Sequence, residues 1–318
     1  MRSKSGLTLF ELLVVLAILA SLAAAATVAT DRVLARRRLE ITQQNLTAFR
    51  RAVSGQYGIA AESAPGGTLA ATNLEGFVAD MGRLPLAVSE DATLQLGELW
   101  SNPGGMQLYG RKAAPGDAEV FLNCGWRGPY LDLPVGATAL HDGWGRPFIV
   151  LTSDAGTPEP AAGGQPIFGL LSLGSDGAIG VTTTELPMAE DLTVWLGDPL
   201  SSPLHADLSV TVWQHDGEGG RTAPEGNGSL IVRLYLPDPT TGGVTFLQST
   251  VLTGPFASAP QVAFADVPLG PKVFRAYWQD EEGNSSLSVP LDVTVTRGGV
   301  THWDLLLPQS VSAEGGTP

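Results

Sequence analysis

The sequence predicts an α+β protein in which a long N-terminal transmembrane helix packs on a small antiparallel sheet and an all-β sandwich domain follows. Three features of the chain predict this fold. Residues 7–30 are apolar or small apart from one ionisable side chain, Glu11. Two apolar runs bounded by turn residues lie in the middle of the chain, at 148–151 and 167–173. Beyond residue 203, short alternating runs recur at the spacing typical of a sandwich.

Length and composition limit the classes of protein that remain. The chain has 318 residues, enough for about two domains beyond an N-terminal helix. Its 39 Gly and 23 Pro favour turns and loops. The net charge of −14 argues against nucleic acid as a partner, because phosphate binding needs clustered Lys and Arg. The acidity fits either plain solubility or a few carboxylates that hold a cation such as calcium.

Residues that would carry catalysis are few, and we expect no enzyme. The single cysteine, Cys124, excludes an intramolecular disulfide, and an inert small hydrophobe is its favoured interpretation. No GxSxG, HExxH or phosphate-loop motif is present, and acidic runs such as Asp280-Glu281-Glu282 lie in Gly-rich apparent turns. The histidines, none of which has a metal-ligand spacing, are His141, His205, His215 and His302.

The apolar N-terminal segment has three competing interpretations. At about 1.5 Å per residue, a helix over residues 7–30 is roughly 36 Å long and can cross a bilayer core of about 30 Å. It is either an ordinary secretory signal cleaved near Ala23-Ala24-Ala25, a plain membrane anchor, or a helix in which Glu11 has a function. A carboxylate at the bilayer centre costs about 2.5 kcal/mol or more and needs a partner, which an ordinary signal does not supply.

Gly6 and Glu11 together favour the third interpretation. A basic leader with Arg2 and Lys4, then a Gly, then an apolar helix with Glu at its fifth position resemble the class III signal of type IV pilins and type II secretion pseudopilins. The resemblance implies cleavage between Gly6 and Leu7 by a prepilin peptidase, followed by methylation of the Leu7 amine. It also implies that Glu11 pairs with the cationic N-terminus of a neighbouring subunit during assembly.

The positive-inside rule and the prepilin resemblance predict opposite topologies for this segment. Arginines at 32, 36, 37 and 38 outnumber Arg2 and Lys4, and the positive-inside rule alone would place the C-terminal bulk in the cytoplasm. The prepilin resemblance implies the reverse: a single-pass protein of the bacterial inner membrane, with its bulk in the periplasm or outside the cell.

The helix is predicted to continue well beyond the apolar segment. Leu39, Leu46, Phe49 and Val53 recur at helical spacing and form a stripe that we expect to dock on the sheet. Ser54-Gly55 is the predicted end, because a Gly in the left-handed conformation terminates many helices.

The middle of the chain carries a series of turn motifs in a fixed order. They resemble the GPYL, DPWGxPY, SLGADG and DDI segments of the major pseudopilin of type II secretion, and the resemblance covers roughly residues 1–196. Two departures are a Gly at position 143, where the family has Pro, and a longer loop before residue 190. The matching segments are Gly128-Pro129-Tyr130-Leu131, Asp142-Gly143-Trp144-Gly145-Arg146-Pro147-Phe148, Ser172-Leu173-Gly174-Ser175-Asp176-Gly177 and Glu190-Asp191-Leu192.

The same resemblance implies a calcium site. Transferred position by position, it assigns as ligands the side chains of Asp176, Glu190 and Asp191 and the backbone carbonyl of Leu173. Hard oxygen donors at a Gly-rich turn are what calcium requires. From the residues alone, the alternative is that Asp176-Gly177 is only a turn and that Glu190-Asp191 is a solvated loop or helix start.

The C-terminal region is typical of a β-sandwich, with about seven short strands between Gly- and Pro-rich turns. Residues 264–278 and 293–299 resemble a carboxypeptidase-regulatory-like or transthyretin-like module. Trp213, Trp278 and Trp303 are candidates for a sugar- or protein-binding face, although core positions are the favoured interpretation. The predicted strands are 208–213, 230–236, 244–251, 262–264, 273–278, 291–295 and 302–307.

The expected function is that of a structural subunit of a type II secretion pseudopilus or a related pilus-like filament. Its expected partners are neighbouring filament subunits, the prepilin peptidase, the inner membrane, and a secreted substrate or surface ligand. The alternative is a pilin-anchored adhesin whose sandwich recognises a glycan or a protein. The predicted organisation is a leader at 1–6, a helix at 7–55 that is transmembrane at 7–30, a head at 56–196, a linker at 197–203, a sandwich at 204–310 and a disordered tail at 311–318.

Overall fold

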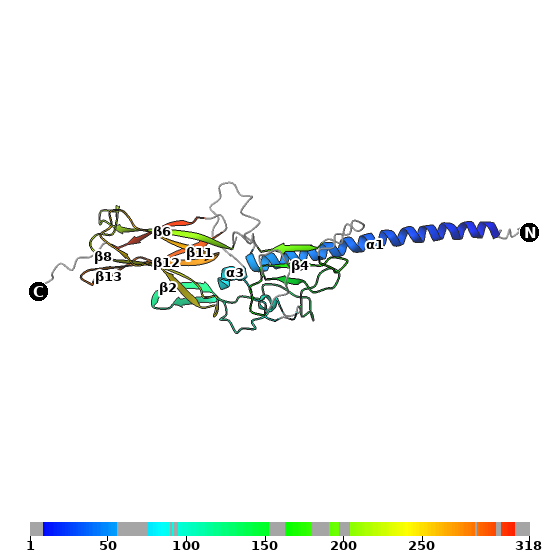
Figure 1. Ribbon diagram of the computed structural model, residues 1–318, viewed down its shortest axis with the longest axis horizontal. Coiled ribbons are helices and arrows are strands. Elements are labelled where there is room, and N and C mark those ends of the chain that lie inside the picture. The colour runs from blue at the N-terminus through cyan, green and yellow to red at the C-terminus, as the bar shows by residue number, and fades with distance from the viewer. Residues whose placement is uncertain are drawn as a thin grey trace, which may run out of the picture.

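The computed structural model shows an elongated molecule, with a long helix projecting from one end and β-sheets at the other (Figure 1). The predictions for the leader, Leu7, Glu190, the linker and the tail lie outside the residues that the structure describes. Those described residues are 9–55, 76–89, 91, 95–152, 163–179, 191–196, 204–283, 285–296 and 300–308.

Helix α1 (Leu9–Ser54) is 46 residues long and ends where the sequence predicts. Gly55 has a φ of 77° and donates its N–H to the Arg51 carbonyl at 2.8 Å, which is the left-handed termination expected of a Gly. The predicted apolar stripe is confirmed over the last turns, where Leu46, Phe49 and Val53 are buried. The second half of α1 is therefore part of the head's core.

The first half of α1 projects away from the rest of the chain (Figure 1). The sequence predicts that residues 7–30 cross a membrane. Among the residues that the structure describes, however, no helix is long and apolar enough to do so.

The head contains a three-stranded antiparallel sheet in the order β3-β4-β5, and β5 packs against α1. Both strands predicted for this region are confirmed, at slightly shorter bounds, whereas β5 and the separate β1–β2 hairpin were not predicted. The elements of the head are α3 (Phe77–Met81), the 3-10 helix η1 (Gly97–Leu99), β1 (Gly110–Ala114), β2 (Asp117–Cys124), β3 (Ile149–Leu151), β4 (Gly169–Ser172) and β5 (Leu192–Trp195).

The C-terminal part consists of two packed sheets, and every strand predicted for it is confirmed. Strands β8, β9, β10, β12, β13 and β14 form one sheet, and β6, β7, β11 and β15 form the other. Their inward side chains share one hydrophobic core. The strands are β6 (His205–His215), β7 (Arg221–Thr222), β8 (Gly228–Pro237), β9 (Val244–Gln248), β10 (Leu252–Thr253), β11 (Gln261–Pro268), β12 (Gly270–Asp280), β13 (Ser285–Leu287), β14 (Leu291–Val295) and β15 (His302–Leu307).

The β1–β2 hairpin of the head covers the outer face of the six-stranded sheet (Figure 1). Leu122 and Cys124 of β2 pack with Tyr235 of β8 and Val273 of β12 in a second small core. Strand β12 is therefore buried on both faces, by the sandwich core on one side and by the hairpin on the other. Head and sandwich are in direct contact, in addition to their covalent connection.

Candidate functional site

The Asp142–Arg146 turn holds α1 against the head. Asp142 is buried, and its Oδ1 accepts hydrogen bonds from the backbone N–H groups of Trp144 and Arg146, both at 2.9 Å. The Gly143 N–H donates to Thr42 Oγ1 of α1 at 2.8 Å. A Cβ at position 143 would overlap the backbone carbonyl of Arg38. A Gly at this departure from the family pattern therefore lets the turn approach the helix backbone.

A buried carboxylate organises the Gly128-Pro129-Tyr130-Leu131 motif. Asp80 of α3 is almost completely buried and forms an ion pair with Arg127 at 2.7 Å. It also accepts a hydrogen bond from the Tyr130 hydroxyl at 3.0 Å. Burial of the ring and the nearby Asp80 charge raise the pKa of Tyr130, so the hydroxyl remains a donor. The Tyr130 ring packs edge-on against Phe77 and Trp126, which fixes the motif in the head's core.

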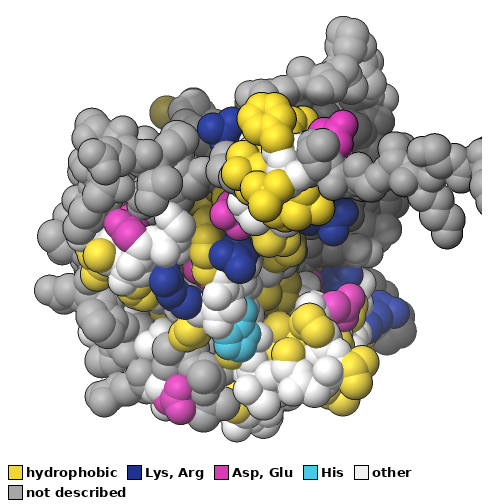
Figure 2. All heavy atoms as spheres, turned by 90° about the vertical axis from the view of Figure 1, so that its right-hand side faces the viewer, with side chains coloured by type: hydrophobic (Ala, Val, Ile, Leu, Met, Phe, Trp, Pro, Cys, Tyr) yellow, Lys and Arg dark blue, Asp and Glu magenta, His cyan; other side chains and the backbone are white. Residues whose placement is uncertain are grey.

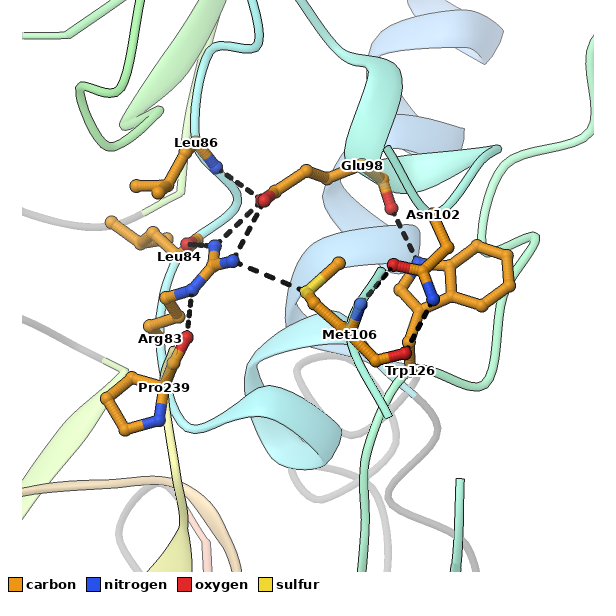
Figure 3. Close-up of polar contacts among 8 residues, drawn as sticks. All are labelled: Arg83, Leu84, Leu86, Glu98, Asn102, Met106, Trp126 and Pro239. Atoms are coloured by element: carbon orange, nitrogen blue, oxygen red, sulfur yellow. Dashed lines mark hydrogen bonds and ion pairs between the residues drawn. The ribbon is translucent and has the colours of Figure 1, made fainter. Parts of the chain in front are cut away.

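A second ion pair lies within the head, and its arginine also donates a hydrogen bond to the sandwich (Figure 3). The Arg83 guanidinium contacts both carboxylate oxygens of Glu98, at 2.7 and 2.8 Å, and its Nε donates to the backbone carbonyl of Pro239, just beyond β8. Glu98 also accepts from the Leu86 N–H, and its backbone carbonyl accepts from the Trp126 indole at 2.9 Å. Arg83 and Glu98 therefore act as structural cross-links.

The predicted calcium ligands are only partly described. The Leu173 carbonyl accepts the Gly177 N–H at 3.1 Å, and Oδ1 of the exposed Asp176 accepts the Ala178 N–H at 3.0 Å. Asp191 lies next to β5 and is half-buried, while Glu190 lies outside the described residues. Within the described part of the chain, no three His, Cys, Asp or Glu side chains are grouped as a metal site would need. The calcium site stays a prediction, and the described residues do not form one by themselves.

A buried lysine was not anticipated from the sequence. Lys272 of β12 is 1% exposed, and its Nζ lies 3.3 Å from the backbone carbonyls of Leu269 and Pro271. Burial lowers the pKa of the Lys272 amine to about 7. Cys124 is fully buried, and burial raises the pKa of its thiol to about 11, which agrees with the inert role predicted for it.

The three candidate tryptophans occupy different environments. Trp278 is buried in the sandwich core, and Trp303 packs on Phe274 with ring centroids 5.7 Å apart. Trp213 lies on the outer face of the four-stranded sheet, where its indole N–H donates to Asp304 at 3.0 Å. The core interpretation is thus confirmed for Trp278 and Trp303, whereas Trp213 belongs to the outer surface.

The assembly candidate, Glu11, lies in the projecting half of α1. Leu9, Phe10 and Leu16 there are between 59% and 83% exposed. Figure 2 looks onto this end of the molecule, and hydrophobic side chains gather at the projecting helix. The helix thus presents an apolar surface with a carboxylate in its first turn.

Comparison with known proteins identifies the N-terminal segment. Residues 1–27 match the family model of the prokaryotic N-terminal methylation motif, and this range includes Gly6, Leu7 and Glu11. No curated protein and no solved structure matches the chain. The match supports a type IV pilin-like prepilin signal. That signal implies processing by a prepilin peptidase and assembly into pilus-like filaments, and it is consistent with a membrane-anchored pilin-type protein.

Proposed function

We propose that this protein is a structural subunit of a type II secretion pseudopilus or a related pilus-like filament. The prepilin peptidase would cut after Gly6, and the N-terminal segment would hold the subunit at the bacterial inner membrane with head and sandwich on the far side. The single observation that carries the proposal is the contrast along α1, whose C-terminal half is buried in the head while its N-terminal half projects with an apolar surface.

The exposed apolar surface supports assembly because it needs a cover. Fully burying a Leu or Phe side chain stabilises by about 1.5–3 kcal/mol, so many such residues along one helix favour strong association. Large exposed apolar patches mark interaction or membrane sites in general. Neighbouring copies of α1, packed along the centre of a filament, supply such a cover. Glu11 would then set the register by pairing with the Leu7 amine of a neighbour, because a buried charge is tolerated only when paired.

The charges of α1 support the same proposal. None of its arginines forms an ion pair with a residue that the structure describes, whereas Arg83, Arg127, Arg221 and Arg275 of the head and sandwich all do. The whole chain is strongly acidic, at −14. The net negative charge of a neighbouring copy would therefore complement the basic positions of α1, which are Arg32, Arg36, Arg37, Arg38, Arg50 and Arg51.

Intact mass and N-terminal sequencing of the protein from its native membrane test the processing. We expect a chain that begins at Leu7 and carries one methyl group. A chain beginning near Ala26 would indicate an ordinary signal peptide and contradict the filament. An uncleaved Met1 would leave a plain anchor and favour a binding protein instead.

Glu11→Gln tests the assembly step itself. The variant keeps the shape of the side chain but loses its charge, so we expect normal processing and at least a tenfold reduction in sedimentable filament, since breaking a buried charge pair costs about 3–5 kcal/mol. Glu40→Gln, an exposed carboxylate of the same helix, is the matched control. Equal filament yield from Glu11→Gln and wild type would contradict the assigned role.

A second candidate function, that of an adhesin, is favoured by one specific observation. The outer face of the four-stranded sheet carries Trp213, and Asp304 on β15 accepts both its indole N–H and the Arg221 guanidinium at 3.0 Å. A fixed aromatic ring among polar groups suits stacking on a sugar or docking of a protein surface. Glycan-array binding by the full chain, lost in Trp213→Ala and kept in Trp195→Ala, would support it. No binding by the wild type would remove the sugar-binding form of this candidate.

A further inference from the structure

The turn at Leu173–Gly177 is built around a guanidinium from another turn. Nη1 of Arg146 donates to the Gly174 carbonyl at 2.8 Å, and Nη2 donates to the Ser175 carbonyl at 3.4 Å. Gly177 has a φ of 70°, and a Cβ there would lie 2.6 Å from the Arg146 Cζ. Position 177 thus requires Gly both for its backbone conformation and for the space that the guanidinium occupies.

Arg146 is itself held in place by a connected set of hydrogen bonds. Asp142 Oδ1 accepts the Arg146 backbone N–H, and Asp142 Oδ2 accepts the Ser172 hydroxyl at 2.8 Å. The Ser172 Oγ in turn accepts the Gly174 N–H at 3.3 Å. Both Asp142 and Ser172 are buried. The two turns therefore form one unit, with the carboxylate of Asp142 at one end and the guanidinium of Arg146 at the other.

A cation at this position satisfies the chemistry of the turn. Backbone carbonyls carry partial negative charge, and a tight Gly-rich turn brings several of them together, as metal-binding loops do. A guanidinium stays charged at every physiological pH and presents its N–H groups in a fixed fork, so one side chain can serve two carbonyls at once. Asp176 Oδ1 accepts the Ala178 N–H at 3.0 Å, so this oxygen already has one partner within the turn.

We propose that Arg146 is the resident cation of the Leu173–Gly177 turn and takes the structural role that the pseudopilin resemblance assigns to calcium. The Leu173–Gly177 turn then needs no metal, and the stability of the protein is independent of calcium.

Thermal unfolding of the full protein tests this proposal. We expect the wild type to melt at the same temperature in calcium and in chelator. Arg146→Gln, which keeps a polar side chain but removes the guanidinium and its charge, should lower the Tm by about 2–4 °C, the shift typical of losing one such contact in a domain of this size. Arg146→Lys should restore part of the loss, since it keeps the charge but not the fork. Arg111→Gln, at an arginine that stacks on the Phe121 ring, is the control for loss of a charge.

Two results would overturn the proposal. One is a calcium-dependent rise in the Tm of the wild type that Asp176→Ala abolishes, which would establish the metal site instead. The other is an Arg146→Gln protein that melts with the wild type. If Arg146→Gln does not fold, the comparison of wild type and Asp176→Ala in calcium and in chelator still decides the question. Neither result depends on whether the protein forms filaments.

Discussion

The two halves of α1 share one continuous helix but have opposite environments. Phe10, near the start, is 72% exposed, whereas Phe49, near the end, is completely buried. The C-terminal half is held by packing and by polar contacts, such as the hydrogen bond from Asn45 Nδ2 to the His141 carbonyl at 2.8 Å. The projecting half has no such contacts from the described head. The C-terminal half of α1 therefore stabilises the subunit, and the N-terminal half is available to contact another molecule.

The largest expected effect is a difference in stability between two matched substitutions, one in each half of α1. Phe49→Ala should lower the free energy of unfolding by about 3–5 kcal/mol, because it leaves a cavity between α1, α3 and the sheet. Phe10→Ala removes the same atoms from an exposed position and should change it by less than about 0.5 kcal/mol. Chemical denaturation of the two variants, followed by circular dichroism, measures the difference. Similar losses in both variants would show that the projecting half is also packed within the subunit.

A somewhat smaller loss of stability tests whether the head, which packs against α1, unfolds together with the sandwich. Asp117 of the hairpin is buried, pairs with Arg275 of β12 and accepts the Tyr277 hydroxyl. Among the described residues, Asp117→Ala leaves the exposed Glu119 as the charged partner of the Arg275 guanidinium, and the substitution should cost about 3 kcal/mol.

The control for this prediction is an ion pair of the sandwich that faces water. Arg221 and Asp304 are both about half exposed, so Arg221→Ala should cost at most about 1 kcal/mol. A single unfolding transition, lowered by Asp117→Ala and not by Arg221→Ala, would show that head and sandwich unfold together. Two separate transitions would show that the hairpin does not couple them.

The smallest expected effect is a dependence of stability on pH that comes from one buried amine, that of Lys272. Because burial lowers the pKa of Lys272 to about 7, the unfolded chain binds this proton more readily than the folded protein between pH 7 and about 10.4. Stability should therefore rise with pH in that window, by about 2 kcal/mol between pH 7 and pH 9. Lys272→Met should abolish this rise, and urea unfolding at several pH values measures it.

Phe10→Ala serves as the comparison for the pH experiment, since a substitution in the projecting half should leave the pH dependence intact. If Lys272→Met and the wild type have parallel pH profiles, then Lys272 is not the source of the dependence.

Much of the fold was predictable because it follows from local periodicity. The stripe of Leu46, Phe49 and Val53 repeats with the period of a helix, and Gly55 supplies the left-handed end. The strands of the sandwich alternate inward apolar and outward polar residues, which a sequence displays directly. The β1–β2 hairpin was missed because Gly-Arg-Lys-Ala-Ala at 110–114 has neither alternation nor β-branched residues. Strand β5 was missed as well, although its Leu-Thr-Val-Trp sequence contains residues that strands favour.

The candidate sites divide in a similar way. The prepilin-type signal at residues 1–27 is recognisable without a structure, because it is a short linear segment. The residues that hold the subunit together cannot be recognised in this way, because their partners are distant in sequence. Arg275, for example, pairs with Asp117 across a separation of 158 positions. The same holds for Arg146, which contacts a turn 28 positions away.

The sequence by itself determined the long helix and where it ends, the longer strands of the sandwich, and that the N-terminus carries a prepilin-type signal, because each of these depends on neighbouring residues. Only the tertiary structure decided that the hairpin covers β12, that Lys272 is buried and that Arg146 occupies the Leu173–Gly177 turn. Those features depend on which polar and charged groups come into contact when distant segments pack together. Such contacts cannot be predicted from a local sequence pattern.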